Sequence, residues 1–153
     1  MRILVINGPN LNMLGTREPD KYGTTTLQSI LDGLRSQAAS AAVELEVVDF
    51  QSNHEGAIVD FLQAESPAAA GIIINAGAFT HYSYAIRDAL ANAALPTVEV
   101  HITNIHAREE FRHHSVFANI VAGQIAGLGP AGYGLALKWH IDRLGATSGG
   151  NGV

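Results

Sequence analysis

The sequence has no cysteine among its 153 residues, which excludes a disulfide framework and any metal site built on thiolates. Charged residues make up only 15% of the chain, and its nine lysines and arginines are scattered within a net charge of −5. Nucleic acid is therefore not an expected partner, because binding a phosphate backbone needs a stripe of basic residues and the sequence has none. No apolar run approaches the roughly 20 residues of a membrane span, and no secretory signal pattern opens the chain. We expect a cytoplasmic protein without a membrane partner.

Hydrophobic residues are abundant, at 47% of the chain. A chain of this length can bury one core but is short for two, so we expect a single domain over residues 1–153, with a flexible tail from about residue 146. So high an apolar fraction in a small chain also suggests that some apolar surface is buried between subunits. We therefore expect a homo-oligomer.

Short β-branched runs alternate with segments of helical spacing. The runs predict strands at residues 3–6, 43–50, 71–75, 96–101 and 120–127, and the spacing predicts helices that begin near Leu27, cover residues 58–62 and 85–90, and close the chain at 133–144. Such alternation predicts a parallel sheet with right-handed crossovers on both faces. The expected fold is α/β, a flavodoxin-like three-layer sandwich with a five-stranded parallel sheet.

Polar residues gather where the predicted strands end. The first strand leads into a long loop, about residues 8–24, and polar segments at 51–55, 75–81 and 99–104 follow the next three strands. Ligands of such sheets bind beyond the carboxyl ends of the strands, and loops this long are commonly lids or binding loops. We interpret the loop as a closing lid that carries chemistry.

Within this loop, Tyr22 and Arg17 suggest a base. Ionising a phenol of pKa near 10 at pH 7 costs roughly 4 kcal/mol, and one close cation lowers a pKa by about one to three units. Arg17 with Arg108 or Arg112 would supply much of that shift; alternatively, Tyr22 packs the loop down. The loop contains no glycine-rich nucleotide-binding motif. The side chain of Asn10 either hydrogen-bonds to a ligand or forms a turn with its own backbone.

Glu99 and His101 share one face of a predicted strand, so the carboxylate fixes the imidazole tautomer, which suits a proton donor; the alternative is a structural histidine. His106, His113 and His114 lie nearby, but their spacing matches no ligand signature and HExxH is absent, so no metal is expected. If residues 104–111 start a helix, the backbone N–H groups of Ile102 and Thr103 before it form an anion pocket suited to a carboxylate. The adjacent Arg87 and Asp88, on the third helix, have the pattern of a solvated pair.

Several motifs together resemble type II 3-dehydroquinate dehydratases, over nearly the whole chain from Met1 to about Leu144. They are NGPNLN (7–12), GTREP (15–19), YG (22–23), GAFTH (77–81), AIRDAL (85–90), EVH (99–101) and NIHAREEFRHHS (104–115). The resemblance implies a flavodoxin-like fold, a dodecamer of trimers, and reversible dehydration of 3-dehydroquinate to 3-dehydroshikimate by anti elimination through an enolate, without metal or cofactor. The reaction would serve the shikimate pathway (aromatic amino-acid biosynthesis) or quinate catabolism.

The resemblance also implies roles for individual residues. Tyr22 resembles the family's base, His101 its general acid and Arg17 the lid arginine that supports the enolate transition state. Asn10 would hold the water that stabilises the enolate oxygen, and Glu99 would orient His101. The implied substrate-binding residues are Asn75, His81, Asp88, Ile102, Thr103 and Arg112, with Asp88 reaching a neighbouring subunit's site.

The sequence departs from the family pattern at Ala76, where many members have proline, and at Phe79, where many have tyrosine.

An alternative function from another class is a flavodoxin-like binding module for a small carboxylate, in which the loop only captures the ligand. Turnover separates the two, because an enzyme generates the ultraviolet absorbance of a conjugated enone from 3-dehydroquinate.

Overall fold

The computed structural model describes residues 1–16, 20 and 24–148. Within these residues, five strands form one parallel sheet in the order β2-β1-β3-β4-β5, so the predicted α/β sheet is confirmed. The strands are β1 (Arg2–Asn7), β2 (Glu46–Gln51), β3 (Gly71–Asn75), β4 (Thr97–His101) and β5 (Gly123–Ala126). The three central strands are buried almost throughout, because helices cover both faces of the sheet.

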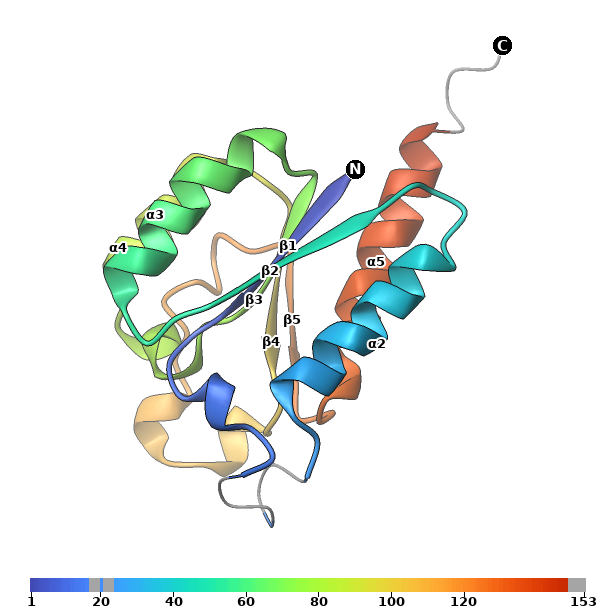
Figure 1. Ribbon diagram of the computed structural model, residues 1–153. Helices are drawn as coiled ribbons and strands as arrows, with labels where there is room; N and C mark the ends of the chain where they lie inside the picture. The colour runs from blue at the N-terminus through green and yellow to red at the C-terminus, as the bar shows by residue number, and fades with distance from the viewer. Residues whose placement is uncertain (17–19, 21–23, 149–153) are drawn as a thin grey trace.

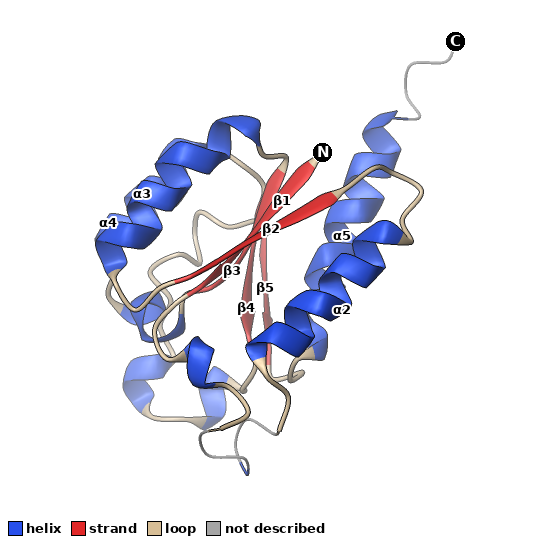
Figure 2. Ribbon diagram, viewed as in Figure 1, coloured by secondary structure: helices blue, strands red, loops and turns tan. Residues whose placement is uncertain are grey.

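Helices α2 (Leu27–Ala39) and α5 (Ala131–Ser148) cover one face of the sheet, and α3 (Glu55–Glu65) and α4 (Tyr84–Ala93) cover the other (Figures 1 and 2). Alternate residues of β1 enter two separate cores. Ile3 and Val5 pack under α2 and α5, whereas Leu4 and Ile6 pack under α3 and α4. None of the helices in the described part of the chain combines the length and the hydropathy needed to cross a membrane.

Some predicted boundaries are wrong. Strand β2 begins at Glu46 rather than at residue 43, and β5 is shorter than the predicted 120–127. The predicted helix at residues 104–111 is instead two 3-10 turns, η4 (Ile105–Ala107) and η5 (Glu110–Arg112), because the segment buries little apolar surface and its backbone is extended at Arg108. Helix α5 continues to Ser148, past the start of the predicted tail; residues 149–153 of that tail lie outside the described residues.

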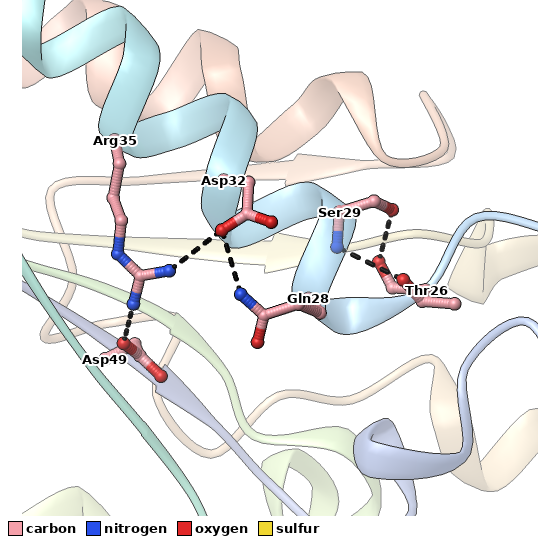
Figure 3. Close-up of polar contacts among 6 residues, drawn as sticks. All are labelled: Thr26, Gln28, Ser29, Asp32, Arg35 and Asp49. Carbon is pink, nitrogen blue, oxygen red and sulfur yellow. Dashed lines mark hydrogen bonds and ion pairs between the residues drawn. The ribbon is translucent and has the colours of Figure 1, made fainter.

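Thr26 caps the first turn of α2 (Figure 3). The backbone N–H of Ser29 donates to Thr26 Oγ1 at 3.1 Å, and Ser29 Oγ donates to the Thr26 carbonyl at 2.8 Å. Further along the helix, Arg35 pairs with Asp32 of the same helix and with Asp49 of β2. Together, these contacts fix the start of α2 after the long loop and its position against β2.

The long loop starts at a close backbone contact. The N–H of Gly8 donates to the Asn75 carbonyl at 2.8 Å, and a Cβ atom on Gly8 would lie 2.1 Å from the carbonyl oxygen of Ala76. Only glycine therefore fits there. The loop then forms the short turn η1 (Leu11–Met13) and buries Leu14 in the core under α2 and α5. Its first half is thus packed against the carboxyl edge of the sheet.

Candidate active site

A pocket of about 310 Å³ opens at the carboxyl edge of the sheet. The strands end at this edge in the lower part of Figure 1. The walls of the pocket come from the loop after β1, the turn after β3, the end of β4 and the turns η4 and η5. Seven residues predicted from the sequence line it: Asn10, Asn75, His81, His101, Ile102, Thr103 and Arg112. The volume suits a small, single-ring molecule, since ligand sites commonly begin at about 300 Å³.

His101 and Glu99 form a buried pair at the end of β4. The Nε2 atom of His101 lies 2.5 Å from Glu99 Oε1, and the side chain of Glu99 is fully buried. Because a carboxylate only accepts hydrogen bonds, Nε2 carries a proton in this contact. Nδ1 is therefore the ring nitrogen left for proton transfer in the pocket. That Glu99 orients His101 for catalysis stays a prediction.

Two further side chains hold the other oxygen of Glu99. Ser115 Oγ donates to Oε2 at 2.8 Å, and Gln124 Nε2 donates to the same atom at 2.9 Å. Burial by itself would raise the pKa of Glu99, but the hydrogen bond and charge of His101, with the bonds from Gln124 and Ser115, outweigh burial and lower it. Glu99 is therefore an anion at neutral pH. Sequence reasoning assigned no role to Ser115 or Gln124.

His81 stands beside His101, with ring centroids 6.4 Å apart and planes inclined by 18°. Its Nδ1 lies 2.8 Å from the carbonyl oxygen of His114, which requires a proton on Nδ1 and leaves Nε2 as an acceptor. Burial lowers the pKa of His81, and the nearby charges of His101 and Arg112 act in the same direction. His81 is therefore neutral at pH 7 and suits recognition of a hydroxyl donor.

Asn75 joins a buried network that sequence reasoning did not find. Its Nδ2 donates to the hydroxyl of Tyr133 at 2.9 Å, and that hydroxyl donates to Asn7 Oδ1 at 2.6 Å. Burial raises the pKa of Tyr133 far above its usual value, which keeps the hydroxyl protonated. The one signal available in the sequence was an asparagine at the end of both β1 and β3.

Asn10 is held in the pocket wall by its backbone. Its φ of 67° lies in the left-handed region, which asparagine tolerates better than most residues. The Asn10 N–H donates to Asn53 Oδ1 at 3.0 Å, and Gln51 Nε2 donates to the same oxygen at 3.1 Å and to the Gly8 carbonyl at 3.1 Å. Gln51 and Asn53, at the end of β2, thus anchor the loop that carries Asn10; their role was also missed.

Positive charge enters the pocket from the turns η4 and η5. Arg112 Nε pairs with Glu109 at 2.8 Å, and Arg108 Nε lies 3.5 Å from the same carboxylate. Arg108 Nη1 also donates to Thr103 Oγ1 at 3.4 Å. Since these turns are too short to act as a helix N-terminus, the condition on which the sequence analysis based an anion pocket at Ile102 and Thr103 is not met. The charge on this wall comes from arginine side chains.

Comparisons with known proteins identify the family. A model of the family described as "Dehydroquinase class II" matches residues 1–141. The chain belongs to the type II 3-dehydroquinate dehydratase family. A "3-dehydroquinate dehydratase" of Roseiflexus castenholzii is 56% identical over 149 residues, 97% of this chain and 94% of the relative. A "Catabolic 3-dehydroquinase 2" of Neosartorya fischeri is 56% identical over 142 residues, 93% of each chain. The crystal structure of a type II dehydroquinase from Butyrivibrio crossotus superposes with a TM-score of 0.87 at 48% identity, covering 92% of this chain and 97% of that one.

Two residues that the family resemblance singles out, Tyr22 and Arg17, lie outside the described residues. Asp88 is on α4, where Arg87 Nη1 lies 3.3 Å from its carboxylate, and it is largely exposed and does not line the pocket. The solvated pair inferred from the sequence is therefore what one protomer shows.

The two departures from the dehydratase family pattern are both buried. Ala76 is fully buried where the turn after β3 begins, and Phe79 packs in the core under α3 and α4, edge-on to Tyr82 with centroids 5.9 Å apart. Among the residues the structure describes, no three histidine or acidic side chains are grouped to hold a metal ion.

Proposed function

We propose that this protein, as a single catalytic domain, converts 3-dehydroquinate to 3-dehydroshikimate by anti elimination through an enolate, with its own side chains as acid and base. Dehydration of 3-dehydroquinate is the activity of the family to which the chain belongs. The observation that carries the mechanism is the His101–Glu99 pair, whose second ring nitrogen is left for a pocket of small-molecule size.

The reaction makes three demands on the site. A base removes a proton from the carbon beside the ketone, and the electron pair of that C–H bond moves to form an enolate. The enolate then expels the hydroxyl group on the next carbon, which takes a proton and leaves as water, and a C=C bond conjugated with the ketone remains. The site must therefore hold a base, a stabiliser of the enolate oxygen and a general acid.

We assign the general acid to His101. Glu99 accepts from Nε2, so protonated His101 carries its transferable proton on Nδ1. Because Ser115 and Gln124 occupy the other Glu99 oxygen, the carboxylate cannot rotate away without losing both bonds. This arrangement delivers a proton to a leaving hydroxyl without first having to reorient the imidazole.

We assign the base to Tyr22 and its activation to Arg17, on the family resemblance. Arg108 and Arg112, which line the described pocket, support this assignment because their charge favours a phenolate nearby. Asn10 holds the water that stabilises the enolate oxygen, and the anchoring of its backbone by Asn53 supports that role.

We further propose that the substrate is bound by the side chains of Asn75, His81 and Arg112 and at the chain segment of Ile102 and Thr103. All five line the pocket. Asp88 does not line the pocket of its own protomer, so its proposed role requires the neighbouring subunit of a trimer, and four such trimers would form the dodecamer.

A Schiff-base route to the same product would need a desolvated lysine. Lys138 does not fit, because its Nζ pairs with Asp142 at 2.8 Å on an exposed face of α5. Lys21 lies outside the described residues. We therefore expect borohydride, added with substrate, neither to inactivate the enzyme nor to add mass to it; a stable reduced adduct would contradict the enolate mechanism.

The proposal is tested by following enone absorbance when purified protein is mixed with 3-dehydroquinate. We expect turnover by the wild type, a loss of about 10²–10⁴-fold in kcat for Glu99→Gln, which removes the charge behind His101, and no loss for the exposed control His54→Gln. Binding of the substrate without enone formation by the wild type would instead identify a carboxylate-binding module.

The pathway needs a separate test. A deletion strain that fails to grow without aromatic supplements indicates the biosynthetic role. A deletion strain that fails to grow only when quinate is the sole carbon source indicates the catabolic role.

A further inference from the structure

We propose that Tyr133 is a positioning residue for substrate binding, whose hydroxyl determines which way the amide of Asn75 faces at the pocket. The inference rests on the proposed role of Asn75 in holding the substrate. Neither the sequence pattern nor the family resemblance assigned Tyr133 any role. It is fully buried, and it does not line the pocket itself.

Three separate elements bring this network together. Asn7 ends β1 and Asn75 ends β3, and the two are direct partners in the parallel register of these strands. Tyr133 reaches them from the first turn of α5. All three side chains are buried, and Asn75 alone among them borders the pocket. Within this network, Asn75 is therefore the residue through which Tyr133 can influence a ligand.

The direction of each hydrogen bond fixes the orientation of the amide. A phenolic hydroxyl has one proton, and Tyr133 gives it to Asn7 Oδ1 at 2.6 Å. Toward Asn75 the hydroxyl can then only accept, so it receives a proton from Nδ2 at 2.9 Å. At the other end of the amide, the Gly77 N–H donates to Asn75 Oδ1 at 3.3 Å.

A flipped Asn75 amide would lose both contacts. Its NH₂ group would meet the N–H of Gly77, and its oxygen would meet the oxygen of Tyr133 with no proton between them. The two contacts therefore act together, and the second N–H of Asn75 is the donor that this arrangement reserves for a ligand. Because burial keeps the Tyr133 hydroxyl protonated, the orientation is independent of pH in the working range.

The network is not optimal for stability alone. Asn7 Nδ2 is buried without a hydrogen-bond partner among the described residues. Replacing a buried polar cluster by apolar groups of the same shape is often neutral or stabilising, so an incomplete polar cluster beside a pocket calls for another explanation. Orientation of Asn75 supplies one.

The start of α5 is also tied to the pocket. The N–H of Gly127 donates to the His101 carbonyl at 3.2 Å, and the N–H of Gly129 donates to the Ile102 carbonyl at 3.0 Å. These bonds hold the segment just before Tyr133 against the end of β4. The position of Tyr133 is therefore fixed relative to the residues that line the site.

The first experiment is Tyr133→Phe, which keeps the ring and removes only the hydroxyl. We expect KM for 3-dehydroquinate to rise by about tenfold and kcat to change by less than about threefold, because a contact made equally in the bound and transition states is weakened. The control Ile58→Val removes one methylene from the core under α3 and α4, and it should lower Tm without raising KM. An unchanged KM in Tyr133→Phe overturns the inference.

The second experiment is a double-mutant cycle with Asn75→Ala. If Tyr133 acts through the amide, Tyr133→Phe should have no further effect on kcat/KM once that amide is gone, whereas additive effects would show a general structural role and overturn the inference. If Tyr133→Phe does not fold, Asn7→Ala decides. It leaves Tyr133 in place but frees its proton, so a raised KM supports the inference and an unchanged KM overturns it. Failure of the proposed function is recognised separately, because the wild type would then form no enone.

Discussion

His140 lies at the end of the sheet opposite the pocket, and its burial makes a prediction about acid stability. The side chain is fully buried on α5, and its Nε2 lies 3.1 Å from the Ile72 carbonyl oxygen, so Nε2 carries a proton. Arg143 Nη2 faces the other ring nitrogen, Nδ1, at 3.4 Å and donates to it. A second proton on Nδ1 would therefore meet a guanidinium group in a buried site.

The magnitude follows from the shift in the pKa of His140. Burial lowers that pKa to about 4, with the charge of Arg143 acting in the same direction and the hydrogen bond to Ile72 opposing it. In the unfolded chain the pKa is about 6.5. Above pH 6.5 the group is neutral in both states and contributes no pH dependence. Between pH 6.5 and 4 only the unfolded chain gains the proton, so the free energy of unfolding falls by about 3 kcal/mol in total.

The assay compares urea unfolding of the wild type and His140→Gln at several pH values from 7.5 to 4.5, at one protein concentration. The variant loses packing at every pH, which shifts its curve by a constant amount. We expect the difference in the free energy of unfolding between the wild type and His140→Gln to shrink as pH falls below 6.5, because only the wild type has His140 to protonate.

The control is His54→Gln, which replaces an exposed histidine that precedes α3. The free energy of unfolding of this variant should change with pH in parallel with that of the wild type. Carboxylates that titrate in the same range are common to all three proteins and cancel in the differences. Parallel curves for the wild type and His140→Gln would refute the reasoning, since they would show that His140 binds its proton equally well in the folded and unfolded states.

Three further predictions concern the loop after β1. Tyr22→Phe should lower kcat by about 10²–10⁴-fold, with binding of the product retained in calorimetry, since only the proton-accepting oxygen is lost. Arg17→Gln should move the acidic limb of the kcat/KM profile upward by about one pH unit, and an unmoved limb would transfer activation of the phenol to another cation such as Arg108. Gly8→Ala should lower Tm strongly and impair folding, because its Cβ would lie 2.1 Å from the Ala76 carbonyl oxygen; a wild-type Tm would show that the two loops can separate without cost.

The arrangement of strands could be predicted because few topologies satisfy the alternation of strands and helices. Runs such as Gly71–Asn75 are apolar on both faces, which indicates a strand between two helical layers, and right-handed crossovers then leave little freedom. The prediction for residues 104–111 failed because polar and charged residues predominate there. Of the residues in its two turns, Ile105 alone is buried, so no apolar face stabilises a full helix.

The site was predictable only in part. Glu99 and His101 are two residues apart on one strand, so the two-residue periodicity of the strand brings them together. The partners of these residues come from far along the chain: Gln124 binds Glu99 from β5, and Tyr133 binds Asn75 from α5. No local pattern encodes such contacts, because they depend on how helices and strands dock. The close contact at Gly8 is likewise visible only in three dimensions.

Asn75 and His101 belong to opposite faces of the sheet. Asn75 follows Ile73, which packs under α5, and Tyr133 from that helix orients it. Glu99 pairs in register with Ile74, which packs under α3 and α4, so Glu99 and His101 belong to the other face. Asn75, proposed to bind the substrate, and His101, proposed to protonate it, are thus supported by different cores and meet at the carboxyl edge. A change in either core can therefore reach the site, and the two kinds of change should differ in effect: those under α5 should act first on KM, through Asn75, and those under α3 and α4 should act first on kcat, through His101.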